Sequence, residues 1–168
     1  GHLKRDPVEY VAADSYESWM TRGIPRKGDV LFTTEAPLAN VAQLDTDERV
    51  VFAQRIITMQ PDRSVLNDSF LKYLLLSKPV QQRIHEKGTG ATATGIKASL
   101  LKKVRIEFPE DILAQVAVVE KLDALESFVE HLEGNLSQKL GHLDELKKSL
   151  LQKAFSGELS RDLTEAAA

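Results

Sequence analysis

The residues best suited to chemistry lie in a run of small residues from 88 to 95, GTGATATG, and in the lysines around it. A glycine-rich loop can bring backbone N–H groups close to a phosphate because no side chain obstructs the approach. An ATP-binding loop also needs a lysine directly after its second glycine, and Ile96 occupies that place here. A dinucleotide site needs a buried strand before the loop, whereas residues 82–87 form a charged helical end. We therefore expect neither kind of nucleotide-cofactor site.

The charge around this loop favours a larger polyanion. Residues 78–105 contain seven lysines and arginines but only one acidic residue, Glu86, which gives a local net charge of +6. Such a patch is typical of surfaces that bind DNA phosphates, and a loop of small residues can approach a groove closely. The alternative is a surface loop beside lysines that cluster by chance. The residues predicted to contact DNA are Lys87, Thr89, Thr92, Thr94, Lys97, Lys102 and Lys103.

Side chains that could perform covalent or metal chemistry are sparse. The four histidines, His2, His85, His131 and His142, do not lie at the spacings of metal ligands. The chain has no cysteine, which excludes disulfides and thiolate sites and fits a reducing cytoplasm. No serine, histidine and carboxylate form a recognisable nucleophilic set. We therefore expect a non-catalytic chain without metal or cofactor.

Strand and helix signals place the small-residue loop in a domain that mixes both. Three segments rich in β-branched and aromatic residues, 29–34, 38–44 and 50–59, predict strands of one sheet. Two helices should follow them. The first is capped by Asn67, and the second has Pro79 in its first turn and runs to about residue 85.

Two further segments have weaker signals. After the loop, Val104, Ile106 and Phe108 alternate with polar residues and predict a last short strand that Pro109 ends. Before the first strand, Trp19 lies in a short amphipathic segment, and we expect this side chain to anchor the segment to the sheet.

A long helix is predicted for the last third of the chain. Glu110 and Asp111 place negative charge at its start and Gly157 supplies a stop, so it should span about 45 residues. Apolar residues recur along it at steps of four and three, and a lone helix cannot bury so narrow a stripe in water. The helix therefore needs a partner helix. The predicted coiled-coil seam consists of Val118, Leu122, Leu125, Val129, Leu132, Leu136, Lys139, Leu143, Leu146 and Leu150.

Two arrangements could cover this seam. A second helix in trans would form a coiled coil, in which Lys139, the polar member, helps to set the register. Alternatively, the chain could turn back near Gly134 or Gly141, because each glycine weakens a helix by up to about 1 kcal/mol relative to alanine. The two halves would then cover each other as a hairpin. The sequence leaves both arrangements open.

Length and charge indicate how the chain is organised. Its 168 residues suffice for one globular domain and an appendage, predicted as 1–109, a helix over 110–157 and a tail over 158–168. Residues 1–109 carry a net charge of +3 and residues 110–168 carry −6, so the overall −3 hides a basic domain. No apolar run approaches the roughly 20 residues that cross a bilayer. We expect a soluble protein without a secretory signal or a membrane partner.

Several motifs occur together in an order that resembles the specificity subunit of type I restriction-modification systems. Together they extend over most of the chain, and the most specific are those that open and close the long helix. The matching segments are KGDVLFTT (27–34), PLANVA (37–42), SFLKYLLL (69–76), GTGA (88–91), EKLDAL (120–125) and LLQKAFSGEL (150–159).

In that family the specificity subunit does no chemistry and directs a methyltransferase and an endonuclease to a two-part DNA sequence. The resemblance implies an α+β or α/β target recognition domain before Pro109, followed by a spacer helix that forms an antiparallel coiled coil. It implies double-stranded DNA, the modification (methyltransferase) subunits and, through the complex, the restriction subunit as partners. The predicted seam adds a partner helix in trans, supplied by a second copy of this chain as a homodimer through the helix or by the missing part of the subunit.

The chain departs from the family pattern in two respects. The segment before the KGDVLFTT motif is much shorter here than in the family, so we expect a recognition domain that is truncated at its N-terminus. Family members usually carry two recognition domains and two helices, whereas the motifs here occur as one set. The terminal segments Gly1-His2 and Ala166-Ala-Ala168 resemble cloning remnants, so we expect a fragment or a half-subunit. The alternative function is a structural adaptor whose globular part binds protein and whose helix oligomerises. Only DNA recognition predicts salt-dependent binding to duplex DNA.

Overall fold

The computed structural model describes residues 1–3, 9–21, 23–90 and 94–158. The chain divides into two compact units, Gly1–Glu120 and Lys121–Ala168, and one long helix, α5 (Ile112–Phe155), contributes residues to both. Within the described ranges, no helix combines the length and apolarity needed to cross a membrane.

A small antiparallel sheet forms the centre of the first unit. Its middle strand, β1 (Val30–Thr33), lies between β2 (Val41–Gln43) and β3 (Ile56–Met59). The three predicted strands are confirmed in place but are shorter than expected, because β1 offers only four residues for β3 to pair with. Antiparallel pairing, with the strands preceding the main helices in sequence, decides between the two expected classes in favour of α+β.

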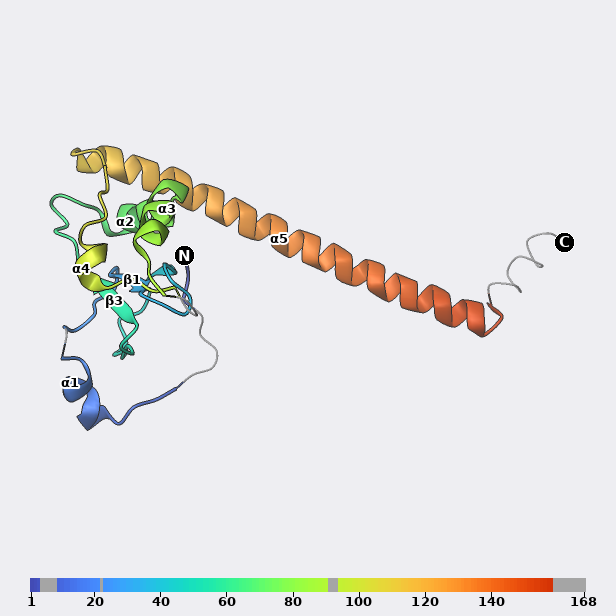
Figure 1. Cartoon of the computed structure of the whole chain (residues 1–168). Helices are drawn as coiled ribbons and strands as arrows, with labels where there is room; N and C mark the ends of the chain where they lie inside the picture. The colour runs from blue at the N-terminus through green and yellow to red at the C-terminus, as the bar shows by residue number, and fades with distance from the viewer. Residues whose placement is uncertain (4–8, 22, 91–93, 159–168) are drawn as a thin grey trace. The chain divides into compact units, whose positions relative to one another are not determined.

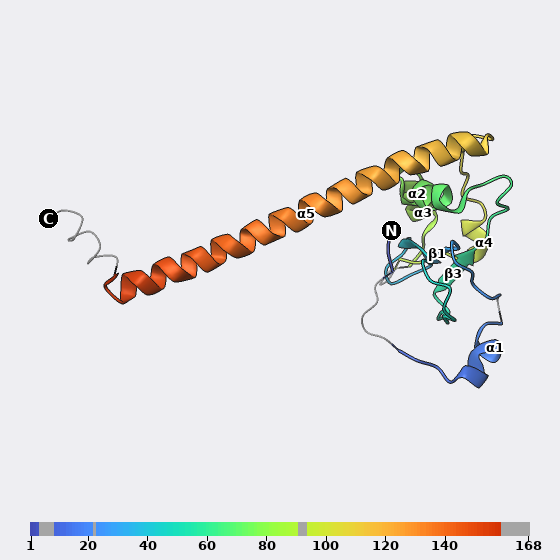
Figure 2. The same ribbon diagram turned by 180° about the vertical axis from the view of Figure 1, so that it is seen from behind.

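Two helices pack against this sheet. In both views α2 (Asp68–Leu76) and α3 (Lys78–Lys87) lie side by side (Figures 1 and 2). Because their apolar faces meet the sheet, side chains from β1, β2, α2, α3 and α5 share one core. The buried residues of this core are Val30, Phe32, Leu38, Ala39, Val41, Leu66, Phe70, Leu71, Leu75, Val80, Ile84, Ile96 and Val119.

The predicted starts of both helices are confirmed. The Asn67 side chain caps α2 by accepting a hydrogen bond from the Phe70 N–H at 3.0 Å. Pro79 lies in the first turn of α3, which continues two residues beyond the expected end, to Lys87. A proline is tolerated there because the first N–H groups of a helix have no partner within it.

Replacing Asn67 with alanine should lower the free energy of unfolding of the first unit by about 1 kcal/mol, because the Phe70 N–H loses its partner. Chemical denaturation measures this change. The matched control is Asn135→Ala on the exposed surface of α5, which should alter the same transition by less than about 0.5 kcal/mol. Equal losses in both variants would show that the cap contributes nothing specific.

The strand expected around Val104, Ile106 and Phe108 is wrong. A short helix, α4 (Ala98–Leu101), precedes this segment, and the Val104 N–H bonds back to the last carbonyl of α4 at 2.9 Å. The carbonyl at position 105 accepts a hydrogen bond from the Arg83 guanidinium at 2.9 Å instead of pairing with a strand. The apolar alternation therefore reflects partial burial against the core.

The segment around Trp19 also differs from expectation. It forms a short turn, η1 (Ala13–Ser15), and α1 (Tyr16–Trp19). The Trp19 indole N–H donates to the Phe52 carbonyl at 3.2 Å, and the Arg49 guanidinium lies 5.4 Å from the centre of the Tyr16 ring. These contacts attach the segment to the connection before β3, and not to the strands themselves.

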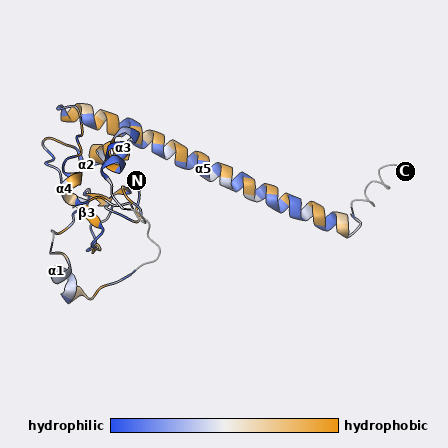
Figure 3. Cartoon of the chain, viewed as in Figure 1, coloured by the Kyte–Doolittle hydropathy of each residue, from blue (hydrophilic) through white to orange (hydrophobic). Residues whose placement is uncertain are grey.

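The long helix is confirmed. It comprises 44 residues and is followed by Gly157 in the left-handed conformation, with φ +77°. It passes through Gly134 and Gly141 without interruption, so the hairpin alternative is wrong. Two isolated glycines weaken a helix by about 1 kcal/mol each, which is a small loss over so many turns. Apolar and polar residues alternate along α5 (Figure 3).

The first turns of α5 are anchored to the core of the first unit by Gln115, whose side chain is fully buried. Its Oε1 accepts from the Asn67 N–H at 2.8 Å. Its Nε2 donates to the carbonyls of Val65 at 3.0 Å and Pro109 at 2.7 Å. Val119, one turn further along, is buried in the core. One polar side chain thus joins α5 to the segments before α2 and before α5 itself.

Candidate nucleic-acid interface

The small-residue loop begins where α3 ends, at Lys87. Thr89 and Gly95 exchange two backbone hydrogen bonds, with N to O distances of 2.8 and 2.9 Å, which close the base of the loop. The Thr89 and Thr94 side chains are exposed. Thr92, also expected to contact DNA, lies outside the described residues. These two hydrogen bonds fix the positions of the two ends of the loop.

The loop base is held against the end of β1. The Ile96 N–H donates to the Thr34 carbonyl at 2.9 Å, and Glu35 forms an isolated bridge with Gly95. A Cβ atom at position 95 would lie 3.1 Å from the Glu35 Cβ and 3.3 Å from the Thr34 carbonyl oxygen. Only a residue without a side chain fits this approach comfortably. The glycine therefore lets the loop lie against the end of the central strand, β1.

The predicted lysines lie at the ends of the two helices that flank this loop in sequence. Lys97 immediately precedes α4, and Lys102 and Lys103 follow it; all three are exposed, whereas Lys87 is half-buried. Among the described residues, no ion pair involves any of these four lysines.

The two arginines of the basic stretch differ from these lysines. Arg83 donates to the Arg105 carbonyl, and the Arg105 Nε lies 3.6 Å from the Glu107 carboxylate. Part of the positive charge of residues 78–105 is therefore used in contacts within the domain.

A buried acidic residue, Asp29, lies in the KGD motif at the turn that starts β1, and Asp68 of α2 lies beside this turn. The carboxylate of Asp29 accepts from the Arg26 N–H at 2.7 Å and from Gln60 at 2.6 Å. Burial raises the pKa of Asp68, although the Arg63 guanidinium at 2.8 Å acts in the opposite direction. Gly28 has φ +95°, and a Cβ there would lie 2.9 Å from the Asp68 carboxylate. The motif thus has a structural explanation.

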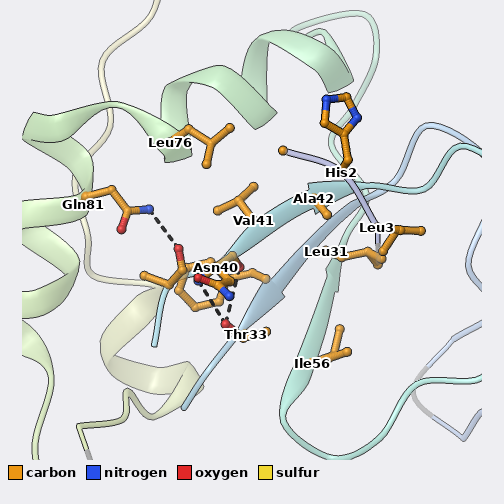
Figure 4. Close-up of a pocket in the computed structure, with 13 residues that line it drawn as sticks. His2, Leu3, Leu31, Thr33, Asn40, Val41, Ala42, Ile56, Leu76 and Gln81 are labelled. Carbon is orange, nitrogen blue, oxygen red and sulfur yellow. Dashed lines mark hydrogen bonds between the residues drawn. The ribbon is translucent and has the colours of Figure 1, made fainter. Parts of the chain in front are cut away.

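A hollow of about 550 Å³ lies next to β1, β2 and the connection between them (Figure 4). Its polar groups are used internally. Thr33 Oγ1 donates to the Pro37 carbonyl at 2.6 Å, and Gln81 Nε2 donates to the Ala39 carbonyl at 3.0 Å. The His2 side chain is the one ionisable side chain among the residues that line the hollow. These contacts support the turn and offer little for binding a polar ligand.

Acidic and histidine side chains are not gathered into a metal site in the part of the chain that the structure describes. No three of them form a group that could hold an ion. The candidate interface therefore consists of the loop base and the lysines beside it.

The seam predicted on α5 is exposed in the second unit. Leu125 is 60% exposed and Leu143 is 62% exposed, far above the values for core leucines. Phe128 and Leu140, which flank the seam, are also exposed. Rows of exposed leucines are unfavourable in water, so a surface of this kind is expected to be covered by another helix.

A model of the family described as "Type I restriction modification DNA specificity domain" matches residues 21–142. This chain belongs to that family. The match includes the sheet, the small-residue loop and most of α5. The family's specificity domain thus corresponds to both parts that the motifs indicated.

Individual relatives agree with this assignment. The EcoBI specificity subunit of a type I restriction enzyme from Escherichia coli is 25% identical over 136 residues, which cover 80% of this chain and 28% of that protein. The structure resembles the S subunit of a type I restriction-modification system from M. genitalium, with a TM-score of 0.54 and 24% identity, covering 67% of this chain and 30% of that one.

A second solved structure, the HsdS subunit from Thermoanaerobacter tengcongensis, matches with a TM-score of 0.53 and 21% identity over 65% of this chain and 28% of that one. These two likenesses establish the fold. The chain spans less than a third of the length of the relatives that it matches.

Proposed function

We propose that this chain is the DNA-reading and spacing part of a type I specificity subunit, which directs restriction and adenine methylation to a bipartite site. The observation that carries the proposal is the family match, which includes both the loop-bearing domain and α5. In this assignment residues 1–109 form a target recognition domain and residues 110–157 form the spacer helix. The helix also offers a docking surface to the modification subunits, and the restriction subunit joins through the complex in the cytoplasm.

The proposed DNA contacts divide by chemistry. Lys87, Lys97, Lys102 and Lys103 neutralise phosphates, which supplies affinity but no sequence information. The small-residue loop, with Thr89, Thr92 and Thr94, approaches a groove because its backbone is unobstructed. Two observations support this division: the four lysines have no acidic partner among the described residues, and Gly95 holds the loop base against the sheet.

Replacing Lys97, Lys102 and Lys103 together with glutamine should weaken binding to duplex DNA and make it less sensitive to salt. Each lost phosphate contact lowers the slope of log K against log salt by about 0.9, so the slope should fall by up to about 3. Fluorescence anisotropy at several salt concentrations measures both quantities. The control replaces Lys27, Arg49 and Lys78, three exposed cations of the first unit outside the predicted contacts, with glutamine, which changes the net charge equally. If both triple variants weakened DNA binding equally, the loss of net charge alone would explain the effect, and a local DNA site would be contradicted.

The partner of α5 in this proposal is the α5 of a second copy, in antiparallel orientation. Residues 112–133 contain five acidic residues and one lysine, a net charge of −4. Residues 135–155 contain four lysines and two acidic residues, a net charge of +2. Antiparallel helices place the acidic half of one copy beside the basic half of the other, whereas parallel helices pair like with like.

The spacing of the seam supports the same pairing. An antiparallel coiled coil that crosses at Gly134 places every seam residue opposite another seam residue. Val118 then faces Leu150 of the second copy, and Leu132 faces Leu136. Lys139 then faces Val129. A shift in register would place Lys139 opposite a different residue. Between Val118 and Leu150 the seam is about 48 Å long at a rise of 1.5 Å per residue.

A further inference from the structure

An exposed ion pair lies beside the base of the small-residue loop. The Arg55 Nε lies 2.8 Å from the Glu35 Oε1, and the two side chains are 63% and 44% exposed. Glu35 is the second residue after the end of β1 and forms the bridge with Gly95. The pair therefore adjoins the loop that approaches DNA in the proposed function. Exposed ion pairs contribute little to stability, so folding alone gives weak reason for this one.

The backbone beneath the pair is firmly held. The Arg55 carbonyl accepts from the Thr34 N–H at 2.8 Å and from the Thr34 Oγ1 at 3.1 Å. Arg55 also immediately precedes β3, whose first residue pairs with Thr33 of β1. On the opposite side, Gly95 lies against the Glu35 Cβ. Both side chains thus start from fixed points where β1 ends and β3 begins, next to the loop base.

The guanidinium retains unused donors. Glu35 occupies the Nε, and among the described residues no hydrogen bond or other ion pair takes up the terminal amino groups of Arg55. An arginine presents planar, paired donors that match the O6 and N7 acceptors of guanine in the major groove. A carboxylate that already orients the guanidinium reduces the freedom that binding would otherwise remove.

We infer that Arg55 reads a guanine in the DNA major groove and that Glu35 is the positioning residue that orients it. The inference rests on the proposed function, because it needs duplex DNA at the loop. It also differs from that function in kind. The lysines there contact phosphates of any sequence, whereas Arg55 discriminates one base pair from the others.

The experiment selects sequences from a pool of DNA duplexes with a randomised centre, using the full 168-residue chain. The unmodified chain should select a sequence with at least one invariant G·C pair. With Arg55→Ala that position should become degenerate, and anisotropy titration should show its discrimination against other base pairs falling by about 10- to 100-fold. The other selected positions and the salt dependence should persist. Circular dichroism establishes that each variant is folded.

Two further variants separate reading from charge. Lys27→Ala removes another exposed cation of the same unit, which pairs with Asp47 at 3.4 Å, and should leave the selected sequence unchanged. Glu35→Gln keeps a side chain of the same size and should retain the preference for guanine with weaker discrimination.

The outcomes that overturn the inference are distinct. If Arg55→Ala selects the same sequence with full discrimination, Arg55 does not read a base. If it weakens all sequences equally and lowers the salt slope, Arg55 contacts a phosphate. If the unmodified chain shows no salt-dependent binding to any duplex, the proposed function fails and the inference fails with it.

Discussion

Replacing Leu132 and Leu136 with aspartate should abolish self-association of the chain through α5. In the proposed antiparallel dimer these leucines would face each other across the two layers next to the crossing point, so each dimer would lose four buried leucines. Burial of a leucine contributes about 1.5–3 kcal/mol, and four carboxylates would replace these side chains. A loss of about 6 kcal/mol or more lowers the dimerisation constant by over roughly 10⁴-fold. Sedimentation equilibrium at several concentrations measures it.

The matched control for this variant is His131→Asp with Gln138→Asp. Both positions are exposed on α5 but lie off the seam, and the pair adds the same two carboxylates. The control should keep the mass of the unmodified chain, which excludes general repulsion as the cause. A double leucine variant that sediments like the unmodified chain would refute a seam-mediated dimer. Circular dichroism is needed because a separated helix loses helicity when its partner is removed.

Replacing Gln115 with leucine should destabilise the first unit by about 3 kcal/mol or more. Leucine fills a similar volume but leaves three partly buried backbone groups, at Asn67, Val65 and Pro109, without their Gln115 partner. An unsatisfied buried group costs about 1–3 kcal/mol. Chemical denaturation measures the loss. Gln138→Leu, on an exposed part of α5, should change stability by less than about 0.5 kcal/mol.

Gln115→Glu provides a test with a pH signature. A charged carboxylate can still accept from the Asn67 N–H but would face the Val65 and Pro109 carbonyls with no proton to donate. Burial and these carbonyls should raise the pKa of the new carboxyl group in the folded state above its value in the unfolded chain. Stability should therefore be greatest below the unfolded pKa and fall as the pH rises through the folded pKa. The difference in free energy of unfolding between the variant and the unmodified chain should therefore change between about pH 4 and 8, where a glutamate with a raised pKa titrates. A difference that stays constant over this range would contradict this role.

Patterns of local sequence predicted the elements of this chain well. The steps of four and three from Val118 to Leu150 predicted α5, and the observed helix ends within two residues of the expected stop at Gly157. Asn67 predicted the start of α2, because a cap depends on residues three positions apart. The alternation of apolar and polar residues at 104–108 wrongly predicted a strand, because the backbone groups there bond to α4 and Arg83. Period alone cannot distinguish a strand from an extended segment laid over a core.

The candidate site was predicted only in part. The basic stretch and small-residue loop were evident because charge and residue size are properties of single positions. Their placement against Thr34 and Glu35 was not, since the loop and the end of β1 are about 60 positions apart in sequence. The ion pair of Arg55 with Glu35 gave no signal either, because charged side chains in turns are common and usually solvated.

The sequence by itself determined the local conformations, the exposed seam and the family, because these depend on periodicity, capping and motifs within short stretches. The tertiary structure alone decided how distant segments meet. Gln115 illustrates the physical reason: it lies 48 residues from Asn67 and 50 from Val65, yet it satisfies both. A polar residue of this type is ordinarily exposed, and only the packing of α5 against the domain turns it into a buried hydrogen-bonding centre.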